Sequence, residues 1–115
     1  IRAVGLCHSD LSVVNGDRPR PVPMALGHEA AAEVLEVGSG VTSVRTGDHV
    51  VMVFVPSCGA CGPCQEGRPA LCEPGAVANT AGTLLGGERR IADADGAPVH
   101  HHLGCSAFAE YAVVS

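Results

Sequence analysis

Four of the six cysteines lie within one short stretch, CGACGPCQEGRPALC, which runs from 58 to 72. A tight turn between two cysteines that are separated by two residues points both sulfurs into one site, and a tetrahedral zinc ion takes four such thiolates. With every position filled by sulfur, a zinc ion here has no position open for substrate, so the spacing C-x2-C-x2-C-x7-C predicts a structural zinc lobe over residues 56–75. Its ligands are Cys58, Cys61, Cys64 and Cys72.

Two other uses of these cysteines stay open. The first three share the C-x2-C-x2-C spacing of bacterial ferredoxins, but that pattern continues with C-x3-C-P, whereas here seven residues separate Cys64 from Cys72 and Glu73 follows. Disulfides or free thiols are the remaining alternative. Nothing in the sequence marks secretion, and disulfide frameworks usually compensate for a small core, so metal in a reducing cytosol is the favoured interpretation.

The composition indicates one small domain rich in turns. The chain has 115 residues, of which 46% are hydrophobic and only 3% aromatic, with 15 glycines and 8 prolines. This favours a mainly β fold, either a barrel or a sandwich, with an aliphatic core. The net charge of −5 argues against nucleic acid and anionic membranes as partners. No apolar run approaches the roughly 20 residues of a membrane span.

Local patterns predict few and short elements. We expect a short helical turn within 7–17 with Ser9 and Asp10 as caps, because both residue types accept hydrogen bonds from free helix amides. The three prolines of 18–27 indicate an extended loop. Strands are expected within 28–41, 46–55 and 106–115, a short strand or hairpin near 88–93 in an otherwise irregular 76–102, and no long helix.

A second group of metal-ligand residues lies in GLCHSD and GHE, outside the cysteine stretch. Cys7 follows an expected strand, and His28 follows an expected loop. One cysteine, one histidine and a further ligand, with water or substrate in the fourth position, make a catalytic zinc arrangement. Taken alone, the pair also fits a core cysteine and a surface histidine.

The order of these segments resembles that of the zinc-dependent medium-chain alcohol dehydrogenases. The similarity runs from GLCHSD through GHEAAAEVLEVGSGVTSVRTGDHV and the four-cysteine lobe to GAPVHHHLGCSAFAEYAVVS. It implies that residues 1–115 form a GroES-like barrel, part of the catalytic domain and incomplete at both ends. The Rossmann domain that binds NAD in this family is expected to be absent, since no G-x-G-x-x-G follows a strand. We therefore expect these residues alone to be inactive.

The resemblance assigns roles to five residues of the second group. It implies that Cys7 and His28 are two of three protein ligands of a catalytic zinc, with the third ligand outside this chain. Glu29 matches an acidic residue beside the metal. Asp10 matches a carboxylate that orients the ligand histidine, and such a partner fixes the imidazole tautomer. Ser9 matches the hydroxyl that starts the proton relay from the substrate.

Other positions carry weaker implications. His8 lies where relatives often contact the cofactor pyrophosphate, and Phe54 lies where many place an aromatic wall of the substrate pocket. Ser12 departs from the family, because many members have a histidine there as the final proton acceptor. The run His100–His102 is interpreted as a polar turn, with a wall of the substrate pocket as the alternative. Cys105, which matches no family ligand, is expected to be structural.

The resemblance therefore predicts a zinc-dependent oxidoreductase that interconverts alcohols with aldehydes or ketones by hydride transfer to NAD(P). It implies two zinc ions per full-length subunit, a cytoplasmic location, a homo-oligomer and a small-molecule substrate. Thiol adducts of formaldehyde are among the candidates. The alternatives are an iron–sulfur electron-transfer protein, which would absorb visible light, and a non-catalytic GroES-like binding module, which would not need GLCHSD or GHE.

Overall fold

The strands form two small sheets in the computed structural model, which describes all residues from 1 to 115. The first sheet is antiparallel in the order β1-β3-β4, and the second has the order β2-β6-β5, with β2 parallel and β5 antiparallel to β6. A closed barrel is not confirmed, because the two sheets are separate. The strands are β1 (Ala3–Gly5), β2 (Met24–Ala25), β3 (Glu29–Glu33), β4 (His49–Val51), β5 (Ile91–Ala92) and β6 (Pro98–His101).

The first sheet places β3 between its two partners. Ala31 lies opposite Ala3 on one side and opposite Val51 on the other. Ala30 and Ala32 alternate with Ala31 and are buried, as expected for a strand with one face toward the core. The core behind this face is small and consists of Ala30, Cys105 and Ala107, with Ile1 and Met52 packed against it.

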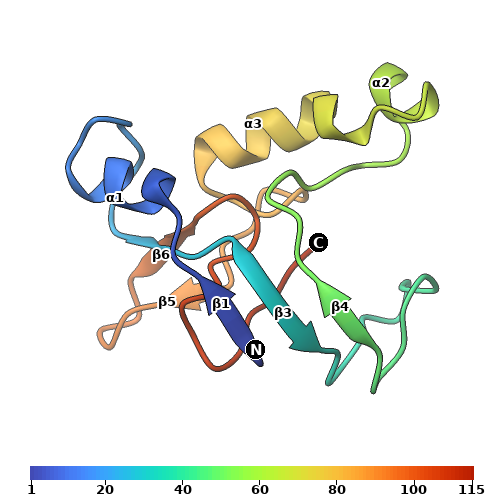
Figure 1. The fold of residues 1–115 in the computed structure, drawn as a ribbon, viewed down its shortest axis with the longest axis horizontal. Helices are drawn as coiled ribbons and strands as arrows, with labels where there is room; N and C mark the ends of the chain where they lie inside the picture. Colours follow the sequence, from blue (N-terminus) through green and yellow to red (C-terminus); the bar gives the residue numbers. More distant parts are fainter.

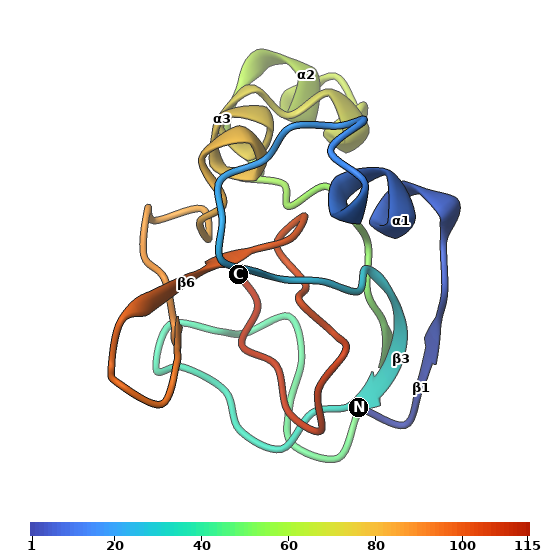
Figure 2. The same ribbon diagram turned by 90° about the vertical axis from the view of Figure 1, so that its left-hand side faces the viewer.

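The helical segments lie together at one end of the molecule, above the sheets in Figure 1, and Figure 2 shows the same arrangement from the side. They are α1 (His8–Val14), α2 (Gly62–Gln65), a 3-10 turn η1 (Pro69–Leu71) and α3 (Glu73–Ala81). The prediction of irregular chain from residue 76 was wrong for 76–81, which belong to α3. Pro74 in the first turn and Gly82 just after the last are typical helix start and stop signals.

The predicted strand over 106–115 was also wrong. The backbone hydrogen bonds between this segment and the rest of the chain are isolated ones, such as Ala107 N–H to Gly27 O and Phe108 N–H to Leu26 O. No continuous ladder forms, so it has no regular secondary structure. The hairpin expected near 88–93 is present in part, as β5 and β6. The other expected strands are confirmed in shorter form, as β3 and β4.

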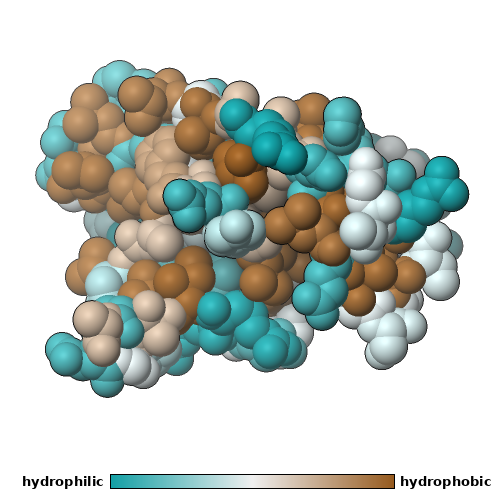
Figure 3. Space-filling model, turned by 90° about the horizontal axis from the view of Figure 1, so that it is seen from below, coloured by the Kyte–Doolittle hydropathy of each residue, from teal (hydrophilic) through white to brown (hydrophobic).

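Much of the apolar surface is not covered within these residues. Val51 and Leu6 are 78% and 87% exposed, and Phe54 is 54% exposed. Figure 3 shows hydrophobic patches between hydrophilic ones on the face seen from below. None of the helices combines the length and the apolar character that a membrane crossing requires.

Candidate metal centres

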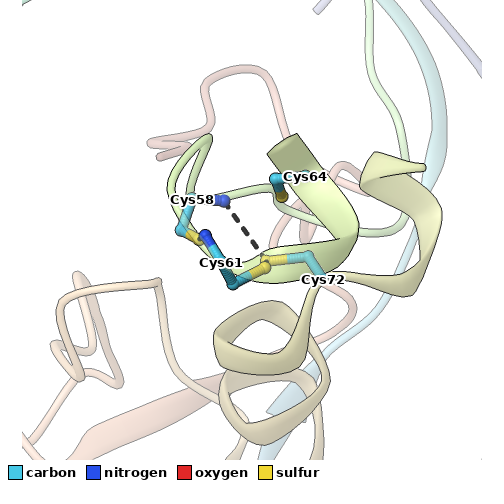
Figure 4. A group of neighbouring side chains, drawn as sticks. All are labelled: Cys58, Cys61, Cys64 and Cys72. Carbon is cyan, nitrogen blue, oxygen red and sulfur yellow. Dashed lines mark hydrogen bonds between the residues drawn. The ribbon is translucent and has the colours of Figure 1, made fainter. Parts of the chain in front are cut away.

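The four clustered cysteines converge on one point. Figure 4 shows their sulfurs gathered where the turn after Cys58, the short helix α2 and the start of α3 meet. One ligand atom from each lies within 4.8 Å of those from the others, and Cys61 Sγ is 4.0 Å from Cys72 Sγ. That separation is far too long for a disulfide, but it matches the roughly 3.8 Å between sulfurs bound tetrahedrally to one zinc ion. All six cysteines are free thiols. The donor set therefore fits zinc.

Backbone amides prepare this cluster for negative charge. The N–H groups of Ala60 and Cys61 donate to Cys58 Sγ, and those of Cys58 and Gly75 donate to Cys72 Sγ. The two amides on its sulfur lower the pKa of Cys58 to about 6. Burial and the neighbouring thiols raise the pKa of Cys64 to about 12. Four thiolates at this spacing repel one another, so only a bound cation stabilises the fully ionised set.

The second group is organised by the start of α1. Cys7 is extended and forms the N-cap, so the expected caps Ser9 and Asp10 lie inside the helix instead. Ser9 does not cap it, so that prediction was wrong. Asp10 does satisfy a free amide, because its Oδ2 accepts from Cys7 N–H at 3.3 Å.

Asp10 also holds His28. Its Oδ1 lies 3.3 Å from His28 Nδ1 and accepts from Gly27 N–H at 3.2 Å, and both side chains of the pair are 6% exposed. With the Nδ1 proton directed at the carboxylate, the Nε2 lone pair of His28 is left free for a metal. One carboxylate thus fixes the backbone at Cys7 and the ring of His28 together.

Other side chains that can bind a metal lie near Nε2 of His28. Ligand atoms of Cys7, His28 and Glu29 lie within 4.8 Å of one another. Ser9 Oγ lies 3.3 Å from both Cys7 Sγ and His28 Nε2. A Cβ atom on Gly5 would come within 2.7 Å of Glu29 Oε2, so the glycine leaves room for that carboxylate. A thiolate, an imidazole and a carboxylate are all zinc ligands, so these residues fit a zinc ion.

Gly27 precedes His28 in a backbone conformation that only glycine adopts without strain. Its φ is +93°, and a Cβ there would lie 2.5 Å from the backbone nitrogen of Phe108. Gly27→Ala should therefore lower the free energy of unfolding by about 2–3 kcal/mol or more in urea titrations. Gly16→Ala is the matched control, because its φ is +82° with nothing within 4 Å. Equal losses in both variants would show that the contact with Phe108 is unimportant.

The remaining predicted residues lie around the same site. Phe54 packs its ring edge-on to His28, with centroids 6.2 Å apart, and both residues border a groove of about 430 Å³ along the first sheet. His8 is exposed in the first turn of α1. Its Nδ1 lies 3.4 Å from Ser12 Oγ, so these two residues face each other rather than the metal donors.

The histidine run is not a polar turn. His101 ends β6, and both His101 and His102 are 1% exposed. Burial lowers the pKa of His101, and it is also the largest influence that lowers the pKa of His102. Sequence reasoning missed the position of His102 beside Asp10 and His28. No alternation marks this position, because His102 follows β6 and the consecutive residues His101 and His102 are both buried. Cys105 is buried outside both donor sets, and burial raises its pKa to about 11.

A converging four-cysteine lobe and a separate cysteine–histidine–glutamate group are donor sets of the kinds found in zinc proteins. The alcohol dehydrogenase GroES-like domain family matches residues 1–115. An S-(hydroxymethyl)glutathione dehydrogenase of Escherichia coli O1:K1 is 43% identical over 112 residues, which is 96% of this chain and 30% of the relative. The chain belongs to the family of alcohol dehydrogenases with this GroES-like domain.

Solved structures agree with this assignment. An alcohol dehydrogenase zinc-binding domain protein from Burkholderia ambifaria superposes with a TM-score of 0.87 at 40% identity, over 96% of this chain and 30% of that one. Benzyl alcohol dehydrogenase from Acinetobacter calcoaceticus gives a TM-score of 0.75 at 36% identity, over 96% and 29%. The chain thus spans about 30% of the length of the relatives it matches.

Proposed function

We propose that the protein containing this chain is a zinc-dependent oxidoreductase that interconverts alcohols with aldehydes or ketones by hydride transfer to NAD(P). The observation that carries the proposal is the convergence of Cys7, His28 and Glu29, with the Ser9 hydroxyl 3.3 Å from two of their ligand atoms. Membership of the alcohol dehydrogenase family supports it.

We propose that this chain provides ligands for two zinc ions, one structural and one catalytic. The four-cysteine lobe over 56–75 holds the structural one, and Cys7 and His28 hold the catalytic one. The third ligand, the nicotinamide site and the strands that would close a barrel lie outside these 115 residues. We place the whole protein in the cytoplasm as a homo-oligomer, with a small-molecule substrate.

The chain's own residues prepare the site for proton removal. Zinc bound there supplies Lewis acidity that lowers the pKa of an alcohol. Ser9 Oγ lies between the two ligand side chains and is placed to accept the hydroxyl proton of a substrate bound at this point. Asp10 keeps the His28 ring in the tautomer that frees Nε2. Ser12 stands where the family's histidine would be, so water or another group takes the proton from Ser9.

Two further residues have proposed contacts outside proton transfer. Phe54 is assigned to the substrate pocket, because its ring borders the groove beside His28. His8 is assigned to the pyrophosphate of the cofactor, because its ring is exposed in the first turn of α1, where helix amides also favour anions.

The substrate class is tested by assay of the whole protein. One relative is an S-(hydroxymethyl)glutathione dehydrogenase and one is a benzyl alcohol dehydrogenase. We propose that this protein acts on an alcohol of one of these kinds. The zinc-loaded protein should reduce NAD or NADP with at least one of S-(hydroxymethyl)glutathione, benzyl alcohol and short aliphatic alcohols. Binding of an alcohol without any turnover would favour the binding-module alternative.

Ser9→Ala tests the proton relay. We expect kcat/KM for alcohol oxidation to fall about 100-fold, because general-base assistance is lost while zinc binding is not. Zinc content should stay unchanged by elemental analysis, and Ser9→Thr should restore most of the activity. Ser43→Ala, on an exposed loop, is the control. Full activity in Ser9→Ala would exclude a relay through this hydroxyl.

A further inference from the structure

Asp10 contacts a second imidazole that the proposed reaction does not use. Asp10, His28 and His102 are 4%, 6% and 1% exposed, and a ligand atom of each lies within 4.8 Å of the others. Asp10 Oδ1 is 3.3 Å from His28 Nδ1 and 3.2 Å from His102 Nδ1. The two rings pack edge to face, with centroids 5.2 Å apart. Two imidazole nitrogens thus converge on one buried carboxylate oxygen.

His102 is not explained by hydrogen bonding. Both of its ring nitrogens are buried, and neither makes a hydrogen bond, since the approach of Nδ1 to Asp10 lacks the required alignment. Leaving such groups unpaired costs about 1–3 kcal/mol each, so an orphaned buried nitrogen points to a missing partner such as a water or an ion.

We propose that Asp10, His28 and His102 form a further metal site, free of thiolate, for a divalent transition metal such as zinc. Bonds of about 2.0–2.2 Å in a tetrahedron put neighbouring ligand atoms roughly 3.3–3.5 Å apart, close to the separations of 3.3 and 3.2 Å found here. Two imidazoles and one carboxylate are a common zinc donor set. Metal–ligand bonds would also satisfy the Nδ1 atom of His102.

The charges around the cluster of Asp10, His28 and His102 predict that it binds a dication more weakly than the four-cysteine lobe does. Asp10 supplies one negative charge, and Arg18 and Arg20 are close enough to act on His102 electrostatically. A dication here therefore keeps an uncompensated positive charge, whereas four thiolates overcompensate it. We expect the lobe to fill first and this site to fill at higher metal concentration.

His28 belongs to both the further metal site and the proposed catalytic site, so metal bound at the further site should inhibit the proposed reaction. A metal on Nδ1 of His28 displaces the hydrogen bond to Asp10, which is the contact that frees Nε2. Binding at both nitrogens would require an imidazolate, so the two metals compete. This consequence rests on the proposed function, but the existence of the site does not.

Cobalt titration of a Cys7→Ser protein isolates the site, because the variant removes the thiolate from the competing group. Thiolate-bound cobalt has strong near-ultraviolet charge-transfer bands, whereas nitrogen and oxygen ligands give only weak visible bands. After the lobe is filled, we expect about one more cobalt ion to bind without any gain in the thiolate band. Absence of this further ion would overturn the proposal while leaving the proposed reaction untouched.

His102→Phe in the same background tests the ligand directly. Phenylalanine keeps a planar ring of similar size but has no nitrogen, so affinity for the further ion should fall at least about 10–100-fold. His100→Phe, two residues earlier in β6 and outside the cluster, should leave that affinity unchanged. The thiolate band of the lobe reports that each variant is folded. Undiminished binding in His102→Phe would also overturn the proposal.

Discussion

Replacing Cys61 and Cys64 together by serine should remove one zinc ion per chain and unfold the segment 56–75. Structural zinc contributes about 10–16 kcal/mol of apparent binding energy in small zinc domains, and little else in this lobe replaces it. Its apolar residue Leu71 is 58% exposed, and α2 spans only four residues, Gly62–Gln65. Elemental analysis should show the loss of zinc, and limited proteolysis should show rapid cleavage within the lobe.

The effect should reach the second group of donors. Cys72 caps α3, since its sulfur accepts from Gly75 N–H, and Asn79 on the same helix donates to the backbone of Phe54 at 3.0 Å. Loss of the lobe therefore loosens the support of Phe54 beside His28. Cys105→Ser is the control, because it changes a buried thiol outside both donor sets. Iron in the purified protein, or zinc content that survives the double replacement, would contradict the assignment of the lobe.

The four-cysteine lobe could be predicted from the sequence because its ligands lie close together along the chain. The spacing of Cys58, Cys61 and Cys64 fixes how their sulfurs meet whatever the rest of the chain does. The pairing of Cys7 with His28 is different. It depends on β1 lying beside β3, in the register that puts Gly5 opposite Glu29. No local pattern gives that register, so only the resemblance to a family brought the two residues together.

The failures have physical reasons as well. Helix α3 contains Gly75, which weakens helix propensity, but it is stabilised by its cap on Cys72 and by packing. His102 was interpreted as surface because histidine is polar, whereas its partner Asp10 lies 92 positions away in sequence. The segment 106–115 alternates like a strand, but it forms only isolated backbone bonds with 26–27. A closed barrel would need continuous pairing there.

His28→Ala should abolish the proposed dehydrogenase activity of the whole protein while the four-cysteine zinc stays bound. The imidazole is the buried ligand of the second group, and Asp10 holds it from behind. Without it, Cys7 and the exposed Glu29 cannot retain a metal. Lewis-acid stabilisation by zinc contributes several kcal/mol to such a reaction, so kcat/KM should fall by at least about 1,000-fold.

Metal analysis separates this loss from general unfolding. His28→Ala should keep about one zinc per chain, in the lobe, and lose any other. The double cysteine variant should instead lose the zinc of the lobe. His49→Ala is the matched control, because His49 is exposed on β4 and belongs to neither donor set. Asp10→Asn should have an effect between those of His28→Ala and His49→Ala. Its affinity for the catalytic metal should be about 10–100-fold weaker than that of the unmodified protein, since the imidazole remains but its orienting charge is lost. If His28→Ala kept full activity, the reaction would have to proceed without a metal held by this histidine, and the proposed catalytic site would be wrong even if the family assignment is right.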